Sequence, residues 1–245
     1  MLILSIDTSC STAGVSLTKD GIVISEIVIN DKNTHSVKLM PAIEMVFKNV
    51  GIDVKDIDAV AVVNGPGSYT GLRIGVSAAK AISYSAEVPV IGVNTLDYLA
   101  SSAILSGEGY VCSVIDARNT HVYYCIYKVI VKSGKQHIER LCDYGAMPVA
   151  ELSDKIKEMN LGRLVFCGDG VTPNRDLFKN LLGDIYQEVC SAASLGRISQ
   201  VGVIAEEIYS AGENEGFFTA DRLDVFYLRT PRISVPKNKS EVALV

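Results

Sequence analysis

Histidine is scarce in this chain, and the cysteines form no metal-binding motif. The three histidines are His35, His121 and His137, with no H-E-x-x-H motif and no pair one helical turn apart. The six cysteines include no C-x-x-C pair and fall mostly in apolar, strand-like stretches. A metal site requires several such ligands at defined spacings. The sequence therefore predicts no metal site, disfavours a metallopeptidase, and indicates buried, reduced thiols.

Long apolar runs and an excess of basic charge are also absent. No apolar stretch is long enough to span a bilayer, and Asp7 breaks the N-terminal run early with no basic residue before it. The net charge is −5, whereas autonomous nucleic-acid binding depends on Lys and Arg facing phosphate. We therefore expect a cytoplasmic protein that contacts no membrane and binds nucleic acid weakly by itself.

A strand, a glycine-rich loop and a helix are predicted between residues 59 and 86. Residues 59–63 are apolar and rich in valine, and they end at Asn-Gly-Pro-Gly, a turn composition. A helix is predicted from Leu72, with Ser68 or Thr70 supplying the capping oxygen. Such a loop directs backbone N–H groups toward whatever lies above it.

The glycines of this loop match neither of the common phosphate-binding motifs. A P-loop has Gly-Lys-Ser/Thr at the helix start, but Gly71 is followed by Leu72 and Arg73. A dinucleotide fingerprint reads G-x-G-x-x-G, and Gly65, Gly67 and Gly71 are spaced one residue too wide. Two alternatives remain at this point: a tight strand-to-helix turn without a ligand, and an anion-binding loop of another kind.

The second half of the chain begins by repeating the first. Residues 3–9 read I-L-S-I-D-T-S and residues 112–118 read C-S-V-I-D-A-R, each an apolar strand, an aspartate and a short turn. Such self-similarity predicts two lobes of common design, and a last short strand is predicted at 225–228. We expect an N-terminal lobe, a C-terminal lobe, and a helix and tail packing back across both, at residues 1–106, 107–193 and 194–245.

Three motifs together resemble the bacterial TsaB (YeaZ) family. They are I-D-T-S at 6–9, N-G-P-G-S-Y-T-G-L-R-I-G at 64–75 and I-D-A-R at 115–118. The resemblance covers nearly the whole chain, most clearly residues 1–127. It implies an α/β, two-lobed actin/Hsp70/sugar-kinase-like (ASKHA) fold, with mixed sheets flanked by helices and a reduced second lobe.

The resemblance also implies a role in tRNA modification. Members of the family are accessory subunits of the complex that transfers the threonylcarbamoyl group to adenosine 37 of tRNAs reading ANN codons. The implied partners are a catalytic TsaD-like paralogue, a TsaE-like ATPase and tRNA, which is contacted through the complex.

The residues themselves argue against catalysis by this copy. The paralogue holds its metal with two histidines in the pattern V-N-H-x-x-G-H. Here the corresponding stretch is V-N-T-L-D-Y-L, with Thr95 and Leu99 in place of the histidines. Leucine has no ligand atom for a metal. We therefore expect a non-catalytic subunit.

Nucleotide binding remains an alternative at three turns. In kinase-type relatives, phosphates lie between two such turns, and glycines let the backbone approach them. Here Ser9 or Cys10 replaces the first glycine and Ala117 replaces the second. The candidate nucleotide contacts are Asp7, Thr8, Ser9, Asp116, Arg118, Gly168 and Gly170.

Two functions compete for these turns. In the accessory subunit the aspartates end their strands and cap local N–H groups, no cofactor binds the isolated chain, and ATP or ADP is contacted only within the complex. The alternative is an ATP-dependent small-molecule kinase of the same fold.

The first two long helices carry more apolar and small residues than one buried face requires. Such a surface on a soluble protein usually marks an interface. We expect it to bind the paralogue and, in the isolated chain, to form a homodimer that excludes the paralogue. The candidate interface residues are Val37, Met40, Ile43, Phe47, Gly71, Gly75 and Ala79.

Overall fold

The first lobe is built on a five-stranded mixed sheet in the order β3-β2-β1-β4-β5. The computed structural model describes residues 1–30, 35–103, 107–132, 135–189, 196–212 and 219–229. β1, β2 and β3 form an antiparallel meander, and β4 and β5 continue the sheet in parallel with β1. The strands are β1 (Leu2–Asp7), β2 (Ala13–Lys19), β3 (Ile22–Ile29), β4 (Ala59–Gly65) and β5 (Val90–Asn94).

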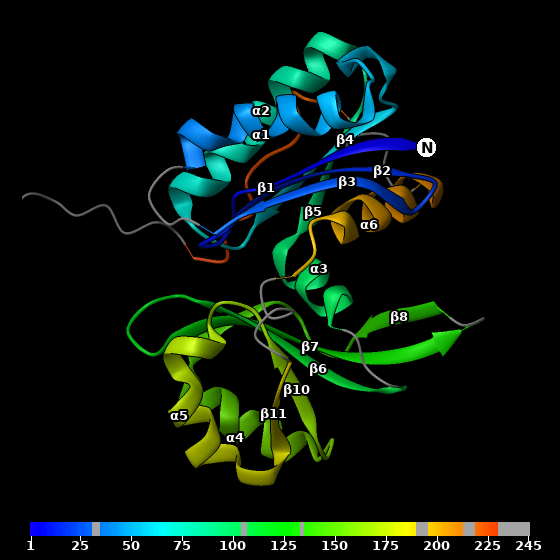
Figure 1. Cartoon of the computed structure of the whole chain (residues 1–245). Coiled ribbons are helices and arrows are strands. Elements are labelled where there is room, and N and C mark those ends of the chain that lie inside the picture. The colour runs from blue at the N-terminus through cyan, green and yellow to red at the C-terminus, as the bar shows by residue number, and fades with distance from the viewer. Residues whose placement is uncertain (31–34, 104–106, 133–134, 190–195, 213–218, 230–245) are drawn as a thin grey trace, which may run out of the picture.

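Two long helices, α1 (His35–Val50) and α2 (Tyr69–Ala86), cover one face of this sheet (Figure 1). Apolar side chains of both helices pack against alternate residues of the strands, and the residues between these point to the opposite face of the sheet. The short helix η1 (Val54–Asp56) precedes β4. The Ser68 hydroxyl caps α2 by accepting from Gly71 N. The strand–loop–helix unit is thus confirmed.

The second lobe repeats the topology of the first. Its sheet runs β11-β10-β6-β7-β8, with β9 paired to β7, so an antiparallel meander is again followed by parallel strands. The strands are β6 (Gly109–Asp116), β7 (His121–Lys132), β8 (Lys135–Arg140), β9 (Gly145–Pro148), β10 (Leu164–Cys167) and β11 (Tyr186–Glu188). The helices α4 (Val149–Met159) and α5 (Val171–Leu182) cover one face, and η2 (Gly183–Ile185) follows.

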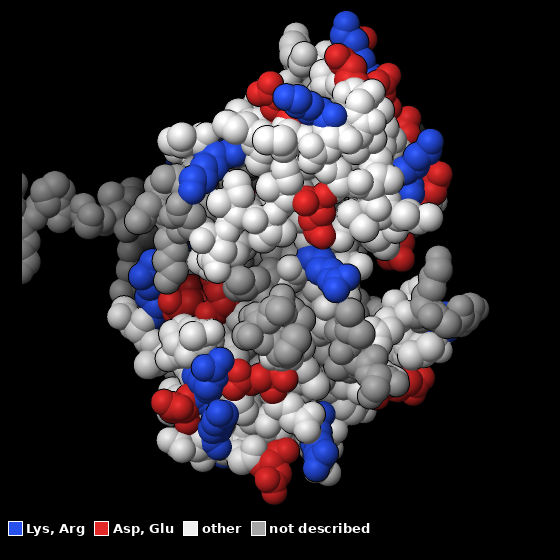
Figure 2. All heavy atoms as spheres, in the orientation of Figure 1, with Lys and Arg blue, Asp and Glu red and all other residues white. Residues whose placement is uncertain are grey.

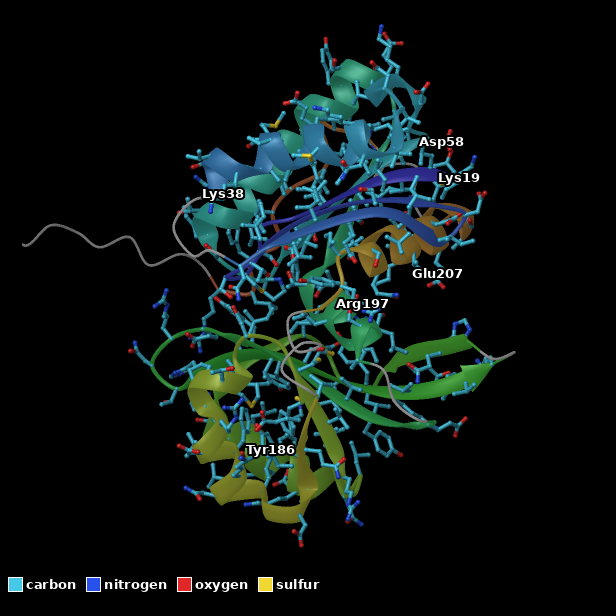
Figure 3. The ribbon with its side chains drawn as sticks, in the orientation of Figure 1. Lys19, Lys38, Asp58, Tyr186, Arg197 and Glu207 are labelled. Carbon is cyan, nitrogen blue, oxygen red and sulfur yellow. The ribbon has the colours of Figure 1, made fainter. Side chains whose placement is uncertain are left out.

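Helices α3 (Thr95–Ser102) and α6 (Ser199–Ser210) lie between the two sheets (Figure 1). One continuous apolar core joins the lower face of the first sheet, both helices and the upper face of the second sheet. Side chains occupy the space between the lobes, where Arg197 is found (Figure 3). The two repeated sheets and their flanking helices confirm the predicted two-lobed α/β architecture.

The chain returns to the first lobe after the second is complete. α6 contacts β1 and β2, and Leu223 is buried in the core beneath α1 and α2. The predicted strand at 225–228 is wrong: Phe226 N donates to Asn64 O, but no ladder forms there. β9 and β11 were not predicted, because strands of four and three residues carry almost no periodic signal.

Among the described residues, no helix is long and apolar enough to cross a bilayer. The predicted tail beyond residue 229 lies outside the described residues.

Candidate functional site

Three turns, one from each of β1, β6 and β10, converge between the lobes. Asp169, in the turn after β10, accepts a hydrogen bond at Oδ1 from the backbone N–H of Asp116, at 3.2 Å. Burial raises the pKa of the Asp169 carboxyl, and the nearby charges of Asp116 and Asp7 raise it further, against backbone hydrogen bonds that lower it. The structure therefore brings the candidate residues of all three turns together, around a carboxylate that the sequence analysis did not select.

The first turn is closed by its own chain. Asp7, Thr8 and Ser9 are all buried. Asp7 accepts at Oδ1 from Ser9 N at 2.7 Å and at Oδ2 from the Tyr98 hydroxyl at 2.5 Å. Burial raises the pKa of the Tyr98 hydroxyl, and the Asp7 charge raises it further, so the tyrosine stays protonated as the donor. Asp7 thus ends its strand and anchors α3, and it does not face an open cleft.

The glycine-rich loop packs directly on this first turn. The Ser68 N–H donates to Ser9 O at 2.6 Å, and the Thr8 hydroxyl donates to Gly71 O at 2.6 Å. A Cβ atom at Gly67 would overlap Ser9 O, and one at Gly71 would overlap Thr8 O. Close approach of two backbones explains these glycines without a ligand.

Two other glycines of the motif are explained in the same way. Gly65 has a φ of +127°, and a Cβ there would overlap Phe226 O. A Cβ at Gly75 would overlap the hydroxyl of Thr8. The motif therefore packs the first turn against the N-terminal end of α2, and it also contacts the C-terminal segment around Phe226.

The second-lobe turns are more open than the first. Arg118 is exposed at the β6–β7 turn, and its N–H donates to Asp116 Oδ1 at 2.9 Å. Gly168 has a φ of +100° and, with Gly170, packs against the backbone of β6, where Gly170 N donates to Val114 O. The accessible part of the candidate nucleotide set is thus Arg118 and the half-buried Asp116.

The geometry does not assemble a metal centre. Among the residues that the structure describes, no group of three or more His, Cys, Asp or Glu side chains could hold a metal ion. Thr95 and Leu99, in place of the paralogue's histidines, are buried in the core between the lobes. His121 bonds to the carbonyl of Asn119 in its own hairpin.

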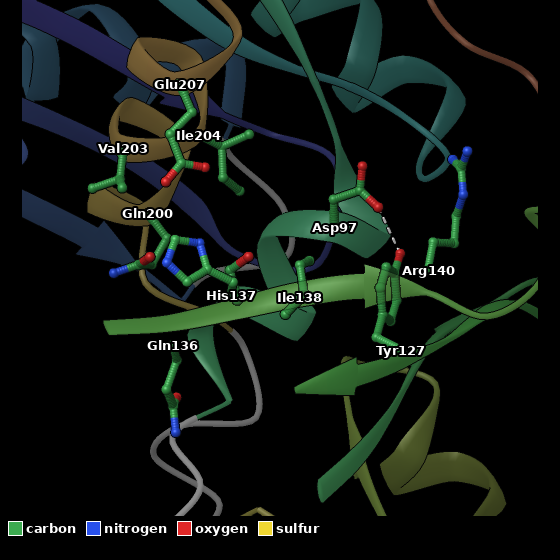
Figure 4. A pocket seen from close by; sticks show the side chains of 11 residues that line it. Asp97, Tyr127, Gln136, His137, Ile138, Arg140, Gln200, Val203, Ile204 and Glu207 are labelled. Atoms are coloured by element: carbon green, nitrogen blue, oxygen red, sulfur yellow. Dashed lines mark hydrogen bonds between the residues drawn. The ribbon is translucent and has the colours of Figure 1, made fainter. Parts of the chain in front are cut away.

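A second polar network joins α3 to the second sheet. The Asp97 carboxylate accepts from the Tyr127 hydroxyl at 2.7 Å and from the Tyr144 hydroxyl at 2.6 Å. A cavity of about 310 Å³ opens beside it, between α3, β8 and α6, and His137, Gln200 and other side chains project into it (Figure 4). Nothing in the sequence linked Asp97 to tyrosines 30 and 47 residues away.

The structure corrects most of the candidate interface. Five members are residues buried within their own lobe, so they do not lie on its surface: Ile43, Phe47, Gly71, Gly75 and Ala79. Gly71, Gly75 and Ala79 of α2 face the sheet, where their small size lets the helix approach β1 and β4 closely.

Another set of apolar side chains on the same two helices is exposed. Val37 and Met40 of the predicted set are 71% and 54% exposed, and Met45 and Tyr84 are 50% and 83% exposed. Figure 2 shows Lys and Arg interspersed with Asp and Glu on the visible face, with wide uncharged areas between them. Part of the apolar surface of α1 and α2 is therefore open to solvent. We call Val37, Met40, Met45 and Tyr84 the helix patch.

Comparisons with known proteins agree with this architecture. The model of the family "TsaD: tRNA N6-adenosine threonylcarbamoyltransferase" matches residues 22–216. The "tRNA threonylcarbamoyladenosine biosynthesis protein TsaB" of Bacillus subtilis is 32% identical over 183 residues, which are 75% of this chain and 77% of that protein. The Escherichia coli protein of the same name is 36% identical over 129 residues, which are 52% of this chain and 55% of that protein.

A solved structure shares the fold over most of its length. A Pseudomonas aeruginosa protein described as similar to peptidase YEAZ has a TM-score of 0.75 at 22% identity, covering 93% of this chain and 99% of its own. From the family model, the sequence relatives and the shared two-lobed fold, this chain belongs to the TsaB (YeaZ) family.

Proposed function

We propose that this chain is the accessory subunit of the complex that transfers the threonylcarbamoyl group to adenosine 37 of tRNAs reading ANN codons. The observation that carries the proposal is family membership, since the sequence relatives are named for threonylcarbamoyladenosine biosynthesis. Its role is to bind and support a catalytic TsaD-like paralogue. A TsaE-like ATPase and tRNA join through the complex, and the setting is the cytoplasm.

The side chains of α3 support a non-catalytic role. Thr95 and Leu99 are both buried, and Leu99 belongs to the apolar core between the lobes. Leucine offers no ligand atom. The transfer reaction is therefore assigned to the paralogue.

The arrangement of the three turns supports the absence of a cofactor in the isolated chain. The first turn, where phosphate would approach, is covered by Ser68 and Gly71. Arg118 remains exposed, so contact with ATP or ADP is proposed only within the complex.

The helix patch supports a protein partner. Its members are large, exposed apolar side chains on two neighbouring helices, and exposed apolar surface on a soluble protein usually marks an interface. We assign the patch to the paralogue and, in its absence, to a second copy of this chain around a two-fold axis. The homodimer and the heterodimer then exclude each other.

Light scattering tests the interface. The wild-type chain alone should have the mass of a dimer, and increasing amounts of paralogue should convert it into a mixed complex. Met40→Glu should weaken both assemblies, because a charge would be desolvated in the interface. Val131→Glu, at an exposed apolar position in the second lobe, is the matched control. A strict monomer, or a homodimer that persists inside the mixed complex through the same helices, would refute this interface.

Depletion of the chain in its host tests the function itself. Threonylcarbamoyladenosine in bulk tRNA, measured by mass spectrometry of nucleosides, should fall. An unchanged level, in a genome with no second copy of the gene, would rule the function out.

A further inference from the structure

Cys125 and Cys142 face each other across neighbouring segments of the second sheet. Beyond the last paired residues of β7 and β8, Leu141 N donates to Ile126 O at 2.8 Å, so the antiparallel ladder continues by one step. Pairing with β7 resumes at Tyr124 with Gly145, two residues out of the earlier register. Residues 142–144, which connect β8 to β9, therefore all lie opposite Cys125, and Cys142 is the first of them.

The two side chains are in contact in the reduced state. The Cys125 thiol donates a hydrogen bond to the carbonyl oxygen of Cys142, with Sγ 3.2 Å from that oxygen. Cys125 is buried, while Cys142 is half-buried and so open to a small reagent from solvent. The pair therefore combines the accessible thiol of Cys142 with the buried thiol of Cys125 beside it.

The surroundings favour the thiolate at Cys142. The neighbouring Cys125 thiol lowers the pKa of Cys142 to about 6, and the Ile126 N–H and the Lys155 ammonium lower it as well, against burial. The neighbouring Cys142 sulfur and burial raise the pKa of Cys125, which therefore keeps its proton. Thiolates are the reactive form toward oxidants.

The other described cysteines provide a contrast. Cys10, Cys112 and Cys167 are all buried, and burial raises the pKa of each thiol. Because a raised pKa leaves little of the reactive thiolate, we expect these three cysteines to be inert. Cys190 lies outside the described residues.

We propose that Cys125 and Cys142 form a redox-active dithiol that a hydroperoxide converts into a cross-strand disulfide. The Cys142 thiolate attacks the peroxide, the O–O bond breaks, and sulfenic acid forms at Cys142 while the other oxygen leaves as water or an alcohol after protonation. The Cys125 sulfur then attacks the Cys142 sulfur, the S–O bond breaks, and the second oxygen leaves as water with the Cys125 proton. Two thiols are oxidised and one peroxide is reduced.

The site adjoins the junction of the lobes. Tyr144, two residues beyond Cys142, donates to Asp97 of α3 at 2.6 Å, and Tyr127, two residues beyond Cys125, donates to the same carboxylate. The disulfide would therefore tie together the two segments that hold α3.

Peptide mapping of the full chain tests this inference. In a Cys190→Ser background, one equivalent of hydrogen peroxide should join the peptides containing Cys125 and Cys142, with the loss of two hydrogen atoms. Cys142→Ser should abolish the cross-link, whereas Cys112→Ala, the matched control, should leave it unchanged. A Cys142 that is oxidised to sulfinic acid without cross-linking, or that does not react while Cys10 or Cys167 does, would overturn the proposal.

A second measurement needs no oxidation. The rate of Cys142 alkylation by iodoacetamide in the wild-type chain should rise through about pH 6. In Cys125→Ala, checked for folding by circular dichroism, the rise should move to higher pH because the neighbouring thiol is gone. A wild-type rise at the ordinary thiol range, near pH 8.5, would contradict the proposed pair.

Discussion

At the scale of single residues, Gly71 lies where the backbone of the first turn leaves no room for a side chain. A Cβ in Gly71→Ala would overlap Thr8 O, so either the loop or the turn must move. We expect the free energy of unfolding to fall by about 2–3 kcal/mol, the upper range for overpacking. Urea denaturation measures the loss.

Gly107→Ala is the control for this substitution. A Cβ at Gly107 would have no neighbour within 4 Å, and its backbone is not left-handed. The change should stay within about 0.5 kcal/mol of wild type. Equal effects of the two substitutions would show that the packing of the first turn is not what requires Gly71.

The partly buried carboxyl of Asp169, in the turn after β10, makes the stability of the fold depend on pH. Burial raises the pKa of its carboxyl, so the folded chain binds that proton more tightly than the unfolded chain does. The contribution of Asp169 to the free energy of unfolding is complete below the ordinary aspartate pKa, at about 3.9. This contribution is lost as the pH rises through the raised pKa that Asp169 has in the folded chain. In Asp169→Asn this loss should be absent.

The measurement is the difference in free energy of unfolding, wild type minus Asp169→Asn. It should fall as pH rises above about 4, because only the wild type must ionise a partly buried group. Asp184→Asn, at an exposed position, is the matched control. A difference that rises with pH would mean that the folded state favours the charged carboxylate.

At the scale of elements, the start of α2 depends on one hydroxyl. Ser68 Oγ accepts from Gly71 N at 3.3 Å, and the cap residue has an extended backbone. Ser68→Ala should destabilise the chain by about 1 kcal/mol, measured by thermal unfolding. Ser77→Ala, on the exposed side of the same helix, should be neutral or slightly stabilising, since alanine has the higher helix propensity. If Ser68→Ala did not change the thermal unfolding of the chain, α2 would be stabilised by its packing alone and not by the cap.

The elements show which parts of the structure the sequence could predict. The strand–loop–helix around Asn64 and the repeat of residues 3–9 were predictable, because local periodicity and turn composition encode them. The orientation of α2 was not, because small residues occur all round this helix and only the sheet beneath it decides that Gly75 and Ala79 point inward. The Tyr98–Asp7 bond spans 91 residues and leaves no local pattern.

At the scale of the whole molecule, the lobes share a core. Leu99 of α3, Ile115 of β6 and Val201 of α6 are buried in one cluster that reaches from the first sheet to the second. Burying apolar surface is the main stabilising contribution in folding. Separation of the lobes would therefore expose a core that both need, and we expect them to unfold as one unit.

Differential scanning calorimetry tests this expectation. A single transition should appear, with a calorimetric enthalpy equal to the van't Hoff enthalpy, as cooperative unfolding requires. Leu99→Ala, which opens a cavity at the junction, should lower the temperature of that one transition. Phe178→Ala, in the separate core beneath α4 and α5, is the matched comparison: because unfolding is shared, it should also lower the whole transition. Two wild-type transitions, only one of which responds to Phe178→Ala, would show that the lobes are independent and that the junction core does not couple them.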